Sequence, residues 1–370
     1  MNYCKTCVMP DTKPGLKFDA DGVCFACLNS KKKTIINWKK RNNLLHKLCD
    51  EIRGKNKNGY DCVVPVSGGK DSIYQTYMMS QIYNLKVLAV SVPQHCQTEE
   101  GILNLNSLVS NLEVDLIKVT IRHETHKKLR RIGLKEMGNP SYSEHKSIFA
   151  GVTRVALNFK VPLIVWGEDI GLEFGGKVDK KSSKAGVADD LINNDLFSDV
   201  SFQDFVKNRI PKKELYFYNH PEISEFKKHN IKTIYLSHFH NWDGYYNFKQ
   251  AQKFGFIGRK KGPLSGNILN YDNIDEKLCE MHIWIKMLKY GFWRPTDQSC
   301  YHIWNRRMTR EEGVENVLAK QYQFPYEYLT DFLDYHTLKE GEFFDELEKW
   351  RNKDIWIKRN NKWRLKKEII

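Results

Sequence analysis

A short loop of glycine, serine and charged residues between two apolar segments places the firmest constraint on this chain. Residues 60–66 (YDCVVPV) are apolar and partly β-branched, the loop at residues 67–72 has the sequence SGGKDS, and residues 73–83 are again mainly apolar. This order predicts a β-strand, a tight loop and an α-helix. Glycines let the backbone approach phosphate oxygens, and the following helix points its N-terminal amides at them. The segment therefore predicts an α/β fold with a phosphate-binding loop after its first strand.

The alternation of strands and helices continues to residue 239. Apolar runs predict further strands at residues 86–92, 114–120, 161–167 and 232–239, and helices at residues 99–112 and 141–159. Near-continuous apolar strands separated by helices are typical of a parallel sheet covered on both faces. We therefore expect an N-terminal cysteine module at residues 1–30, a linker helix at 31–58, a doubly wound parallel α/β domain at 59–241 with a polar insertion at about 171–211, and a helical C-terminal region at 242–370.

The side chains of the loop suit a nucleotide triphosphate. Ser67 and Ser72 offer hydroxyl donors and Lys70 offers a mobile positive charge. Asp71 would be repelled by phosphates unless it holds Mg²⁺, so a metal ligand is its expected role. The loop lacks the GxxxxGK[ST] spacing of kinases and GTPases. A glycine-rich turn without a ligand is the alternative, and the flanking strand and helix favour ATP binding.

Four cysteines lie within the first 27 residues of the chain. Cys4 and Cys7 form one CxxC pair, and Cys24 and Cys27 form a second pair sixteen residues later. Two such pairs have the spacing of a four-cysteine zinc ribbon, in which four protein ligands leave no open position for catalysis. A redox dithiol or unrelated buried cysteines are the alternatives. Among the remaining cysteines, Cys96 and Cys300 are the candidates for a reactive thiol.

The sequence VPVSGGKDS at residues 64–72 resembles the pyrophosphate loop of the PP-loop ATP pyrophosphatases. Members of that family adenylate a carbonyl or carboxyl oxygen, release pyrophosphate, and let ammonia or a sulfur nucleophile displace AMP. The resemblance implies that Ser91, at the end of the second strand, lies where the family holds the adenosine. It also implies ATP and Mg²⁺ as ligands of this chain.

A narrower resemblance covers nearly the whole chain. The start of the ribbon (CKTCVMPDT, residues 4–12) and later blocks are similar to the N-acetyl sugar amidotransferases of bacterial surface-glycan biosynthesis. The later blocks are WGED and EFGG at residues 166–169 and 173–176, LSHF and WDGY at 236–239 and 242–245, and PTDQSCY and TREE at 295–301 and 309–312. The resemblance implies an enzyme that converts an acetamido group of a lipopolysaccharide, O-antigen or flagellin sugar into an acetamidino group. It also implies separate glutaminase and cyclase-like subunits, similar to those of imidazole glycerol phosphate synthase, that supply ammonia.

The same resemblance supplies candidate site residues. Catalytic roles fall to Lys70, Asp71, Lys146 and Glu168, and ATP contacts to Val66, Ser67, Gly68, Gly69, Lys70, Asp71, Ser72, Ser91 and Gly167. Contacts with the sugar fall to His145, Asp169, His238, Asp243, Arg294, Asp297 and Arg306. Asp71 would hold Mg²⁺, and Cys4, Cys7, Cys24 and Cys27 would hold Zn²⁺.

Bulk properties leave one competing enzyme class open. No apolar run approaches the length of a membrane span and the N-terminus lacks a signal peptide, so we expect a cytoplasmic protein without membrane contact. A net charge of +14 fits a tRNA-thiolating PP-loop enzyme, the principal alternative. Such enzymes carry a catalytic cysteine near the loop or on a later strand, and outside the ribbon this chain has no CxxC pair, so a nucleic-acid partner is not expected. A non-catalytic protein with a vestigial loop is a second alternative, against which the intact SGGKDS argues.

Overall fold

A computed structural model describes residues 1–56, 59–175 and 201–370 of the chain. Its centre is a five-stranded, all-parallel sheet with the strand order β3-β2-β1-β4-β5. The strands are β1 (Cys62–Pro65), β2 (Val87–Ser91), β3 (Asp115–Lys118), β4 (Leu163–Trp166) and β5 (Lys232–Tyr235). This confirms the predicted parallel α/β fold. The chain runs from β1 outward to β3 and then returns to the other side of β1, so the strand order reverses between β1 and β4, where ligands bind in open α/β sheets.

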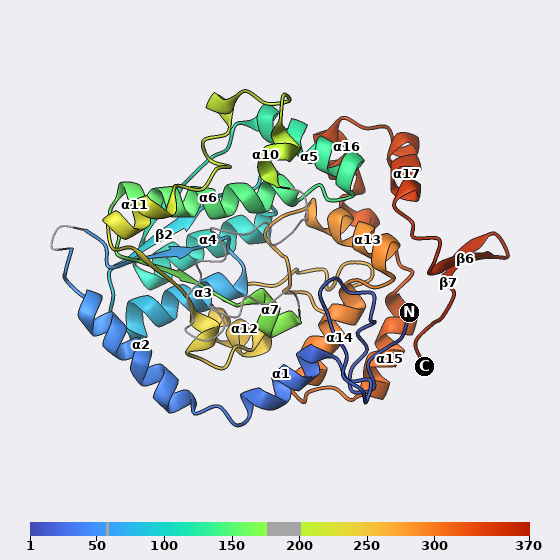
Figure 1. Ribbon diagram of the computed structural model, residues 1–370, viewed down its shortest axis with the longest axis horizontal. Coiled ribbons are helices and arrows are strands. Elements are labelled where there is room, and N and C mark those ends of the chain that lie inside the picture. Colours follow the sequence, from blue (N-terminus) through green and yellow to red (C-terminus); the bar gives the residue numbers. More distant parts are fainter. Residues whose placement is uncertain (57–58, 176–200) are drawn as a thin grey trace.

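Helices cover both faces of the sheet (Figure 1). One face packs on α2 (Trp38–Ile52), α3 (Lys70–Tyr77), α4 (Glu99–Leu112) and α12 (Gly244–Gln252). The other packs on α5 (His123–Met137), α6 (Tyr142–Asn158), α10 (Phe202–Val206) and α11 (Ile223–Lys228). Successive strand residues point to opposite faces, so Val63 and Val64 of β1 enter different cores. Both faces are therefore apolar, as the continuous apolar strand sequences require.

Short elements modify several predicted boundaries. The predicted strand at 232–239 stops at Tyr235 and continues as a 3₁₀ turn, η3 (Leu236–His238), while α3 continues as a π-helical turn, η1 (Met78–Ile82). The predicted insertion at 171–211 begins with α7 (Ile170–Phe174) and includes α10, and its residues 176–200 lie outside the described residues. A further 3₁₀ turn, η2 (Lys212–Glu214), follows α10. Across the described ranges, no helix is long and apolar enough to span a bilayer.

The C-terminal region is helical but ends in a hairpin. Its helical elements are α13 (Cys279–Tyr290), α14 (Arg294–Trp304), α15 (Arg310–Lys320), η4 (Tyr326–Tyr328), α16 (Leu329–His336) and α17 (Glu340–Lys349). Strands β6 (Trp356–Arg359) and β7 (Lys362–Leu365) then form an antiparallel pair that projects from the body of the molecule (Figure 1). Asn360 and Asn361 both have positive φ at the turn, the backbone of a tight hairpin. The expectation of a purely helical region was wrong at this hairpin.

The N-terminal cysteine module packs against the C-terminal helices instead of the sheet. Figure 1 shows the N-terminal segment beside α14 and α15. Its four cysteines, Val8 and Met9 share one buried cluster with Phe292, Cys300, Val317 and Ile369. The linker was predicted as one helix over 31–58, but it contains a break: α1 (Phe25–Lys33) ends before Asn37, whose side chain caps α2 by accepting from the Lys40 amide at 2.9 Å.

Candidate active site

The loop at residues 67–72 lies at the carboxyl end of β1, at the point where the strand order reverses. Gly68 has a φ of +93°, and a Cβ atom on it would lie 2.4 Å from the carbonyl oxygen of Gly101 in α4. Within the loop, the Gly69 amide donates to Ser67 Oγ at 3.2 Å, and Ser72 Oγ donates to the Gly69 carbonyl at 2.9 Å. These contacts bring the loop close to α4 and direct the N-terminus of α3 toward the sheet edge. The arrangement suits a phosphate group.

Replacement of Gly68 by alanine should disrupt this loop. The left-handed backbone strains any residue with a Cβ, and the clash with the Gly101 carbonyl adds to the strain, so we expect a loss of about 1–3 kcal/mol in unfolding free energy. Gly69 is the matched control for stability, because its φ is negative and its added Cβ would approach only Ser67 Oγ, at 3.3 Å. Urea denaturation of both variants measures the difference. Equal stabilities would contradict the assigned loop geometry.

Lys70 is held between two carboxylates. Its Nζ lies 2.9 Å from Asp71 Oδ2 and 2.9 Å from Asp272 Oδ1, and the remaining Asp71 oxygen accepts from Asn247 Nδ2 at 2.8 Å. Burial alone would lower the pKa of Lys70, but the charges of Asp272 and Asp71 outweigh it and raise the pKa well above its ordinary value. Lys70 is therefore a fixed positive charge at the start of α3.

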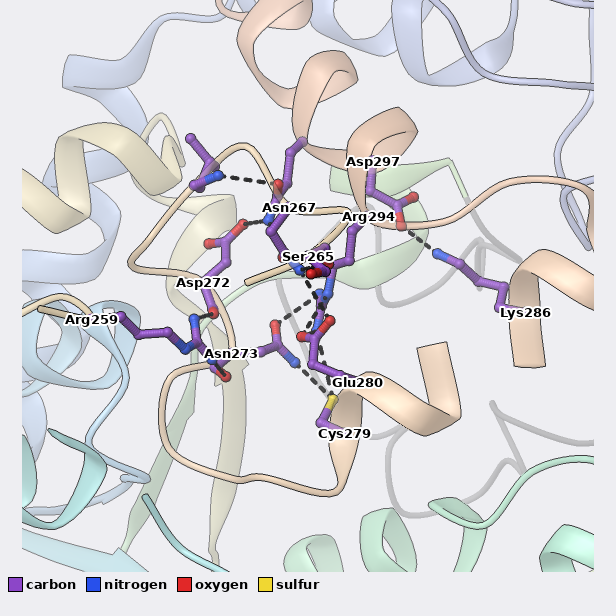
Figure 2. Close-up of polar contacts among 12 residues, drawn as sticks. Arg259, Ser265, Asn267, Asp272, Asn273, Cys279, Glu280, Lys286, Arg294 and Asp297 are labelled. Carbon is purple, nitrogen blue, oxygen red and sulfur yellow. Dashed lines mark hydrogen bonds and ion pairs between the residues drawn. The ribbon is translucent and has the colours of Figure 1, made fainter. Parts of the chain in front are cut away.

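A polar network fixes the segment that carries Asp272 (Figure 2). The Arg259 guanidinium donates to the Asp272 and Asn273 carbonyls at 2.9 and 2.6 Å, and Gln298 Nε2 contacts Asp272 Oδ2 at 3.4 Å. Arg294 donates to Glu280 Oε1 through Nε at 3.1 Å and through Nη2 at 2.8 Å. Each of these partners comes from the C-terminal region. The network therefore positions a carboxylate of that region against the phosphate loop.

Asp275 adds a second carboxylate from the same segment. A Cβ on Gly101 would lie 2.6 Å from the Asp275 Cα, so α4 and this segment are in close contact. Burial raises the pKa of Asp275, and its hydrogen bond with Ser67 offsets part of that rise. Sequence reasoning missed both Asp272 and Asp275, because nothing in their local sequence relates them to a loop two hundred positions earlier.

The end of β4 lies beside the loop, as predicted. The three residues that follow β4 are Gly167, Glu168 and Asp169, and each has a different role. A Cβ on Gly167 would lie 2.3 Å from Gln75 Nε2, so this glycine permits close packing against α3. Asp169 caps α7 by accepting from the Leu172 amide at 3.1 Å. Glu168 is partly buried, and burial together with the nearby charge of Asp71 raises its pKa to about 7. Glu168 is thus the residue of this segment that can exchange a proton near neutral pH.

The stability of the protein should depend on pH through Glu168. Between pH 4.5 and about 7 the native carboxyl keeps a proton that the unfolded chain has lost, so the unfolding free energy falls as pH rises through this window. The shift sets an upper limit of about 3 kcal/mol, which partial exposure lowers. Glu168→Gln should remove this slope and be more stable than wild type above pH 7, in urea titrations without nucleotide or magnesium. Glu315→Gln, at an exposed position in α15, should keep the wild-type slope; a Glu168→Gln variant that also keeps it would contradict the assignment.

The four N-terminal cysteines form a cluster that fits a metal ion. Their sulfur atoms all lie within 4.8 Å of one another, with Cys4–Cys27 at 3.8 Å and Cys7–Cys24 at 3.6 Å. Tetrahedral zinc with bonds of about 2.3 Å places its sulfurs about 3.8 Å apart. The amide of Thr6 and that of Cys24 also donate to Cys4 Sγ, at 3.4 and 3.2 Å. The predicted grouping of the cysteines is confirmed, and their geometry fits zinc.

Four further candidate residues are buried or partly buried: Val66 and Ser91, expected to contact ATP, His145, expected to contact the sugar, and Lys146, expected to be catalytic. Val66 extends the sheet through its amide, which donates to the Val90 carbonyl at 2.9 Å. The Ser91 hydroxyl is buried at the end of β2 and has no hydrogen-bond partner within the described residues. His145 Nδ1 donates to the Ser141 carbonyl at 2.8 Å, and burial lowers the pKa of this imidazole. Lys146 lies 5.9 Å from the ring centre of Phe202.

The expected sugar-binding residues of the C-terminal half are scattered. Asp243 caps α12 through the Tyr245 amide at 3.0 Å, while burial lowers the pKa of His238 to about 4. Arg294 is engaged in the network described above, and Asp297 pairs with Lys286 (Figure 2). Arg306 is exposed after the end of α14. Only Asp243 among these five lines a pocket next to Lys70, together with Arg307, which sequence reasoning missed.

Fold and site together define a parallel α/β protein with a glycine-rich loop at its topological switch point and an attached four-cysteine module. Comparison with known families extends this description. Residues 224–369 match the family model described as "LPS biosynthesis protein WbpG-like, C-terminal domain". This part of the chain, which contributes Asp272 and the network behind it, is therefore similar to a domain of lipopolysaccharide biosynthesis proteins.

Similarity to individual proteins is more distant. The uncharacterized protein MJ1599 of Methanocaldococcus jannaschii is 24% identical over 168 residues, which cover 45% of this chain and 59% of that protein. The aligned part thus spans about three fifths of the curated relative.

Three solved structures show limited likeness. They are NMN synthetase from Francisella tularensis (9% identity, 61% of this chain and 98% of that one, TM-score 0.30), NH3-dependent NAD synthetase from Campylobacter jejuni (15%, 52% and 82%, 0.28), and the U34-tRNA thiolase NcsA from Methanococcus maripaludis with its [4Fe-4S] cluster (14%, 83% and 87%, 0.31). Likeness at these TM-scores says nothing about the substrate of this chain.

Proposed function

We propose that the protein is an ATP-dependent amidotransferase that converts an acetamido group of a sugar into an acetamidino group during bacterial surface-glycan biosynthesis. One observation carries the proposal: the segment around Asp272, which belongs to the WbpG-like domain, reaches across and pairs with Lys70 of the phosphate loop. The part of the chain that resembles lipopolysaccharide biosynthesis proteins therefore contacts the glycine-rich loop directly.

ATP would lie along the loop, with its phosphates at the N-terminus of α3 and its adenosine toward Ser91. The unpartnered Ser91 hydroxyl offers a hydrogen bond there. Asp71 would hold Mg²⁺, since its carboxylate is a hard oxygen ligand with about a third of its side chain exposed. The bound cation would offset the negative charge of the phosphates. Lys70, kept charged by its two carboxylates, would stabilise negative charge that develops on the leaving pyrophosphate.

The chemistry balances in two displacements. The acetamido oxygen attacks the α-phosphorus, the bond to the β-phosphate oxygen breaks, and pyrophosphate leaves. Ammonia then adds to the activated carbon, and the C–O bond breaks to release AMP, which retains the former amide oxygen. The attacking nitrogen must shed protons to become a neutral amidine, and Glu168, whose pKa is raised to about 7 by burial and by the charge of Asp71, would take one of them. We include in the proposal separate glutaminase and cyclase-like subunits as the source of ammonia.

Isotope transfer tests the proposed reaction. A panel of acetamido sugars, free and linked to uridine diphosphate, carries ¹⁸O in the acetamido group and is incubated with ATP, Mg²⁺ and an ammonium salt. We expect the label to appear in AMP, pyrophosphate to form in equal amount, and the labelled sugar to lose about 3 Da as NH replaces ¹⁸O. AMP release that depends on bulk tRNA, with none from any sugar, would overturn the proposal in favour of RNA thiolation.

A further inference from the structure

A pocket opens directly beside the phosphate loop, on the side of the C-terminal region. Its volume, including its solvent-open mouth, is about 710 Å³. Lys70 and Asp71 form one end of it. The remaining walls come from α1 of the cysteine module, from α7, from the start of α12, from residues 269–272 and from the end of α14 with the residues after it. A molecule in this pocket would therefore contact the phosphate loop and the cysteine module at once.

The lining combines aromatic rings with charged groups of both signs. Six aromatic rings and the imidazole of His302 line it; the six are Phe174, Trp242, Tyr245, Tyr271, Tyr301 and Trp304. Ring faces pack against the C–H faces of a sugar, while charged groups at the rim bind hydroxyl and amide groups. Such a mixture favours an uncharged polar ring over a lipid or an exclusively anionic ligand.

The charged residues of the pocket are already paired with one another. Arg307 forms a two-pronged pair with Asp243, at 2.6 and 2.8 Å, and its guanidinium lies 4.9 Å from the ring centre of Tyr245. Lys33 of α1 pairs with Glu173 of α7. Each of these two pairs has no net charge, so neither strongly attracts a charged ligand. The paired side chains can still form hydrogen bonds with a ligand. This again fits a neutral sugar with hydroxyl and acetamido groups.

One wall of the pocket depends on the cysteine cluster. The indole Nε1–H of Trp304 donates to Cys27 Sγ at 3.3 Å, and Ser30 Oγ donates to the Trp304 carbonyl at 2.6 Å. Asn29 Nδ2 contacts the Leu172 carbonyl at 3.4 Å, which attaches α1 to α7 as well. A metal-bound thiolate is a stronger hydrogen-bond acceptor than a free thiol. The position of Trp304 is thus tied by hydrogen bonds to the cysteine cluster and to α1.

From this geometry we infer that the pocket beside Lys70 and Asp71 binds the acetamido sugar, and that the metal-loaded cysteine module positions Trp304 as one of its walls. The inference rests on the proposed function for the identity of the ligand. It gives the module a role in substrate binding that a separate structural appendage would not have.

Steady-state kinetics test the sugar site. At saturating ATP, Trp304→Ala should raise the KM for the acetamido sugar about tenfold or more, while ATP affinity measured by calorimetry and metal content measured by mass spectrometry stay within twofold of wild type. Trp304→Phe keeps a ring but loses the N–H donor, so its KM should lie between that of wild type and that of Trp304→Ala. Trp363→Ala, in the projecting hairpin, is the control and should match wild type. If the wild type is active and the Trp304→Ala variant has the same KM, the sugar site is overturned but the proposed function is not. If the wild type uses no acetamido sugar, the proposed function and the assignment of the ligand are both overturned.

Hydrogen exchange tests the coupling to the metal without any substrate. In the full-length wild-type protein, stripping the metal with a strong chelator should speed amide exchange in α1 and in residues 299–307, and leave β1, β2 and β4 unchanged. Readdition of zinc should reverse the effect. Protection of residues 299–307 that is independent of the metal would overturn the positioning role of the module, whatever the substrate proves to be.

Discussion

Asp71→Asn is expected to lower AMP formation by about a thousandfold while leaving the protein folded. The asparagine is isosteric and can still accept from Asn247, so the start of α3 should remain in place. The lost charge has two effects. It removes the expected ligand of Mg²⁺, and it releases one of the two carboxylates that fix Lys70. Loss of one preorganised electrostatic group at a site of developing charge costs about a hundred- to a thousandfold in rate, and loss of a metal ligand adds to this.

Pyrophosphate release measures the effect, and circular dichroism confirms that the variant is folded. Asp331→Asn is the matched control: this aspartate also pairs with a lysine, Lys277, at 2.6 Å and has similar exposure. It lies in α16, outside the loop and the direct partners of Lys70 and Asp71, and should retain full activity. An Asp71→Asn variant with normal AMP formation would exclude the loop as the site of ATP cleavage.

Cys24→Ser should remove the metal and unfold the N-terminal module. Serine does not supply a soft ligand to zinc, and a structural zinc site stabilises a small module by about 10 kcal/mol or more in isolated peptides. The module has few apolar residues of its own, and its buried cluster relies on residues of α14 and α15. The loss of the metal should therefore also destabilise α14 and α15. We expect the zinc content to fall from one equivalent to none, and limited proteolysis to cleave before residue 38.

Cys96→Ser is the control for this variant, because Cys96 is only partly buried and lies outside the cluster. It should retain one equivalent of zinc and resist proteolysis like wild type. If Cys24→Ser also kept its zinc and its protease resistance, the cluster would not be a structural metal site.

Local sequence pattern predicted the sheet because most of its strands are mainly apolar runs between polar turns, whereas the edge strand β3 is apolar only at its two central residues. The helix expected at 99–112 has those bounds in the structure, since Thr98 caps its start by accepting from the Gly101 amide and Glu113 ends it in a left-handed conformation. The β6–β7 hairpin was missed because its strands are rich in lysine and arginine, which stack on Trp363 and Tyr322 instead of forming an apolar face. The break between α1 and α2 was missed because lysines and apolar residues continue through it.

Sequence reasoning could predict only those residues of the candidate site that lie close together in the sequence. The loop at 67–72 and the paired cysteines carry their function in local spacing. Asp272, Asp275 and Arg307 do not, because they reach the loop through tertiary contacts of a region without a motif. Arg306 and Arg307 are the same residue type at neighbouring positions, yet only Arg307 lines the pocket, and Arg306 has a left-handed backbone conformation.

The packing of the cysteine module on the C-terminal helices sets an order for biosynthesis. Residues 4–27 emerge from the ribosome long before α14 and α15, but their apolar side is covered by Phe292, Val317 and Ile369. Arg310 also donates to the Cys4 carbonyl, at 3.3 Å. A nascent chain that has already captured its metal must therefore wait for almost three hundred further residues before this surface is buried. Sequence separations of this size slow folding, and chains stalled before α14 would expose a loaded but uncovered module to proteases and aggregation.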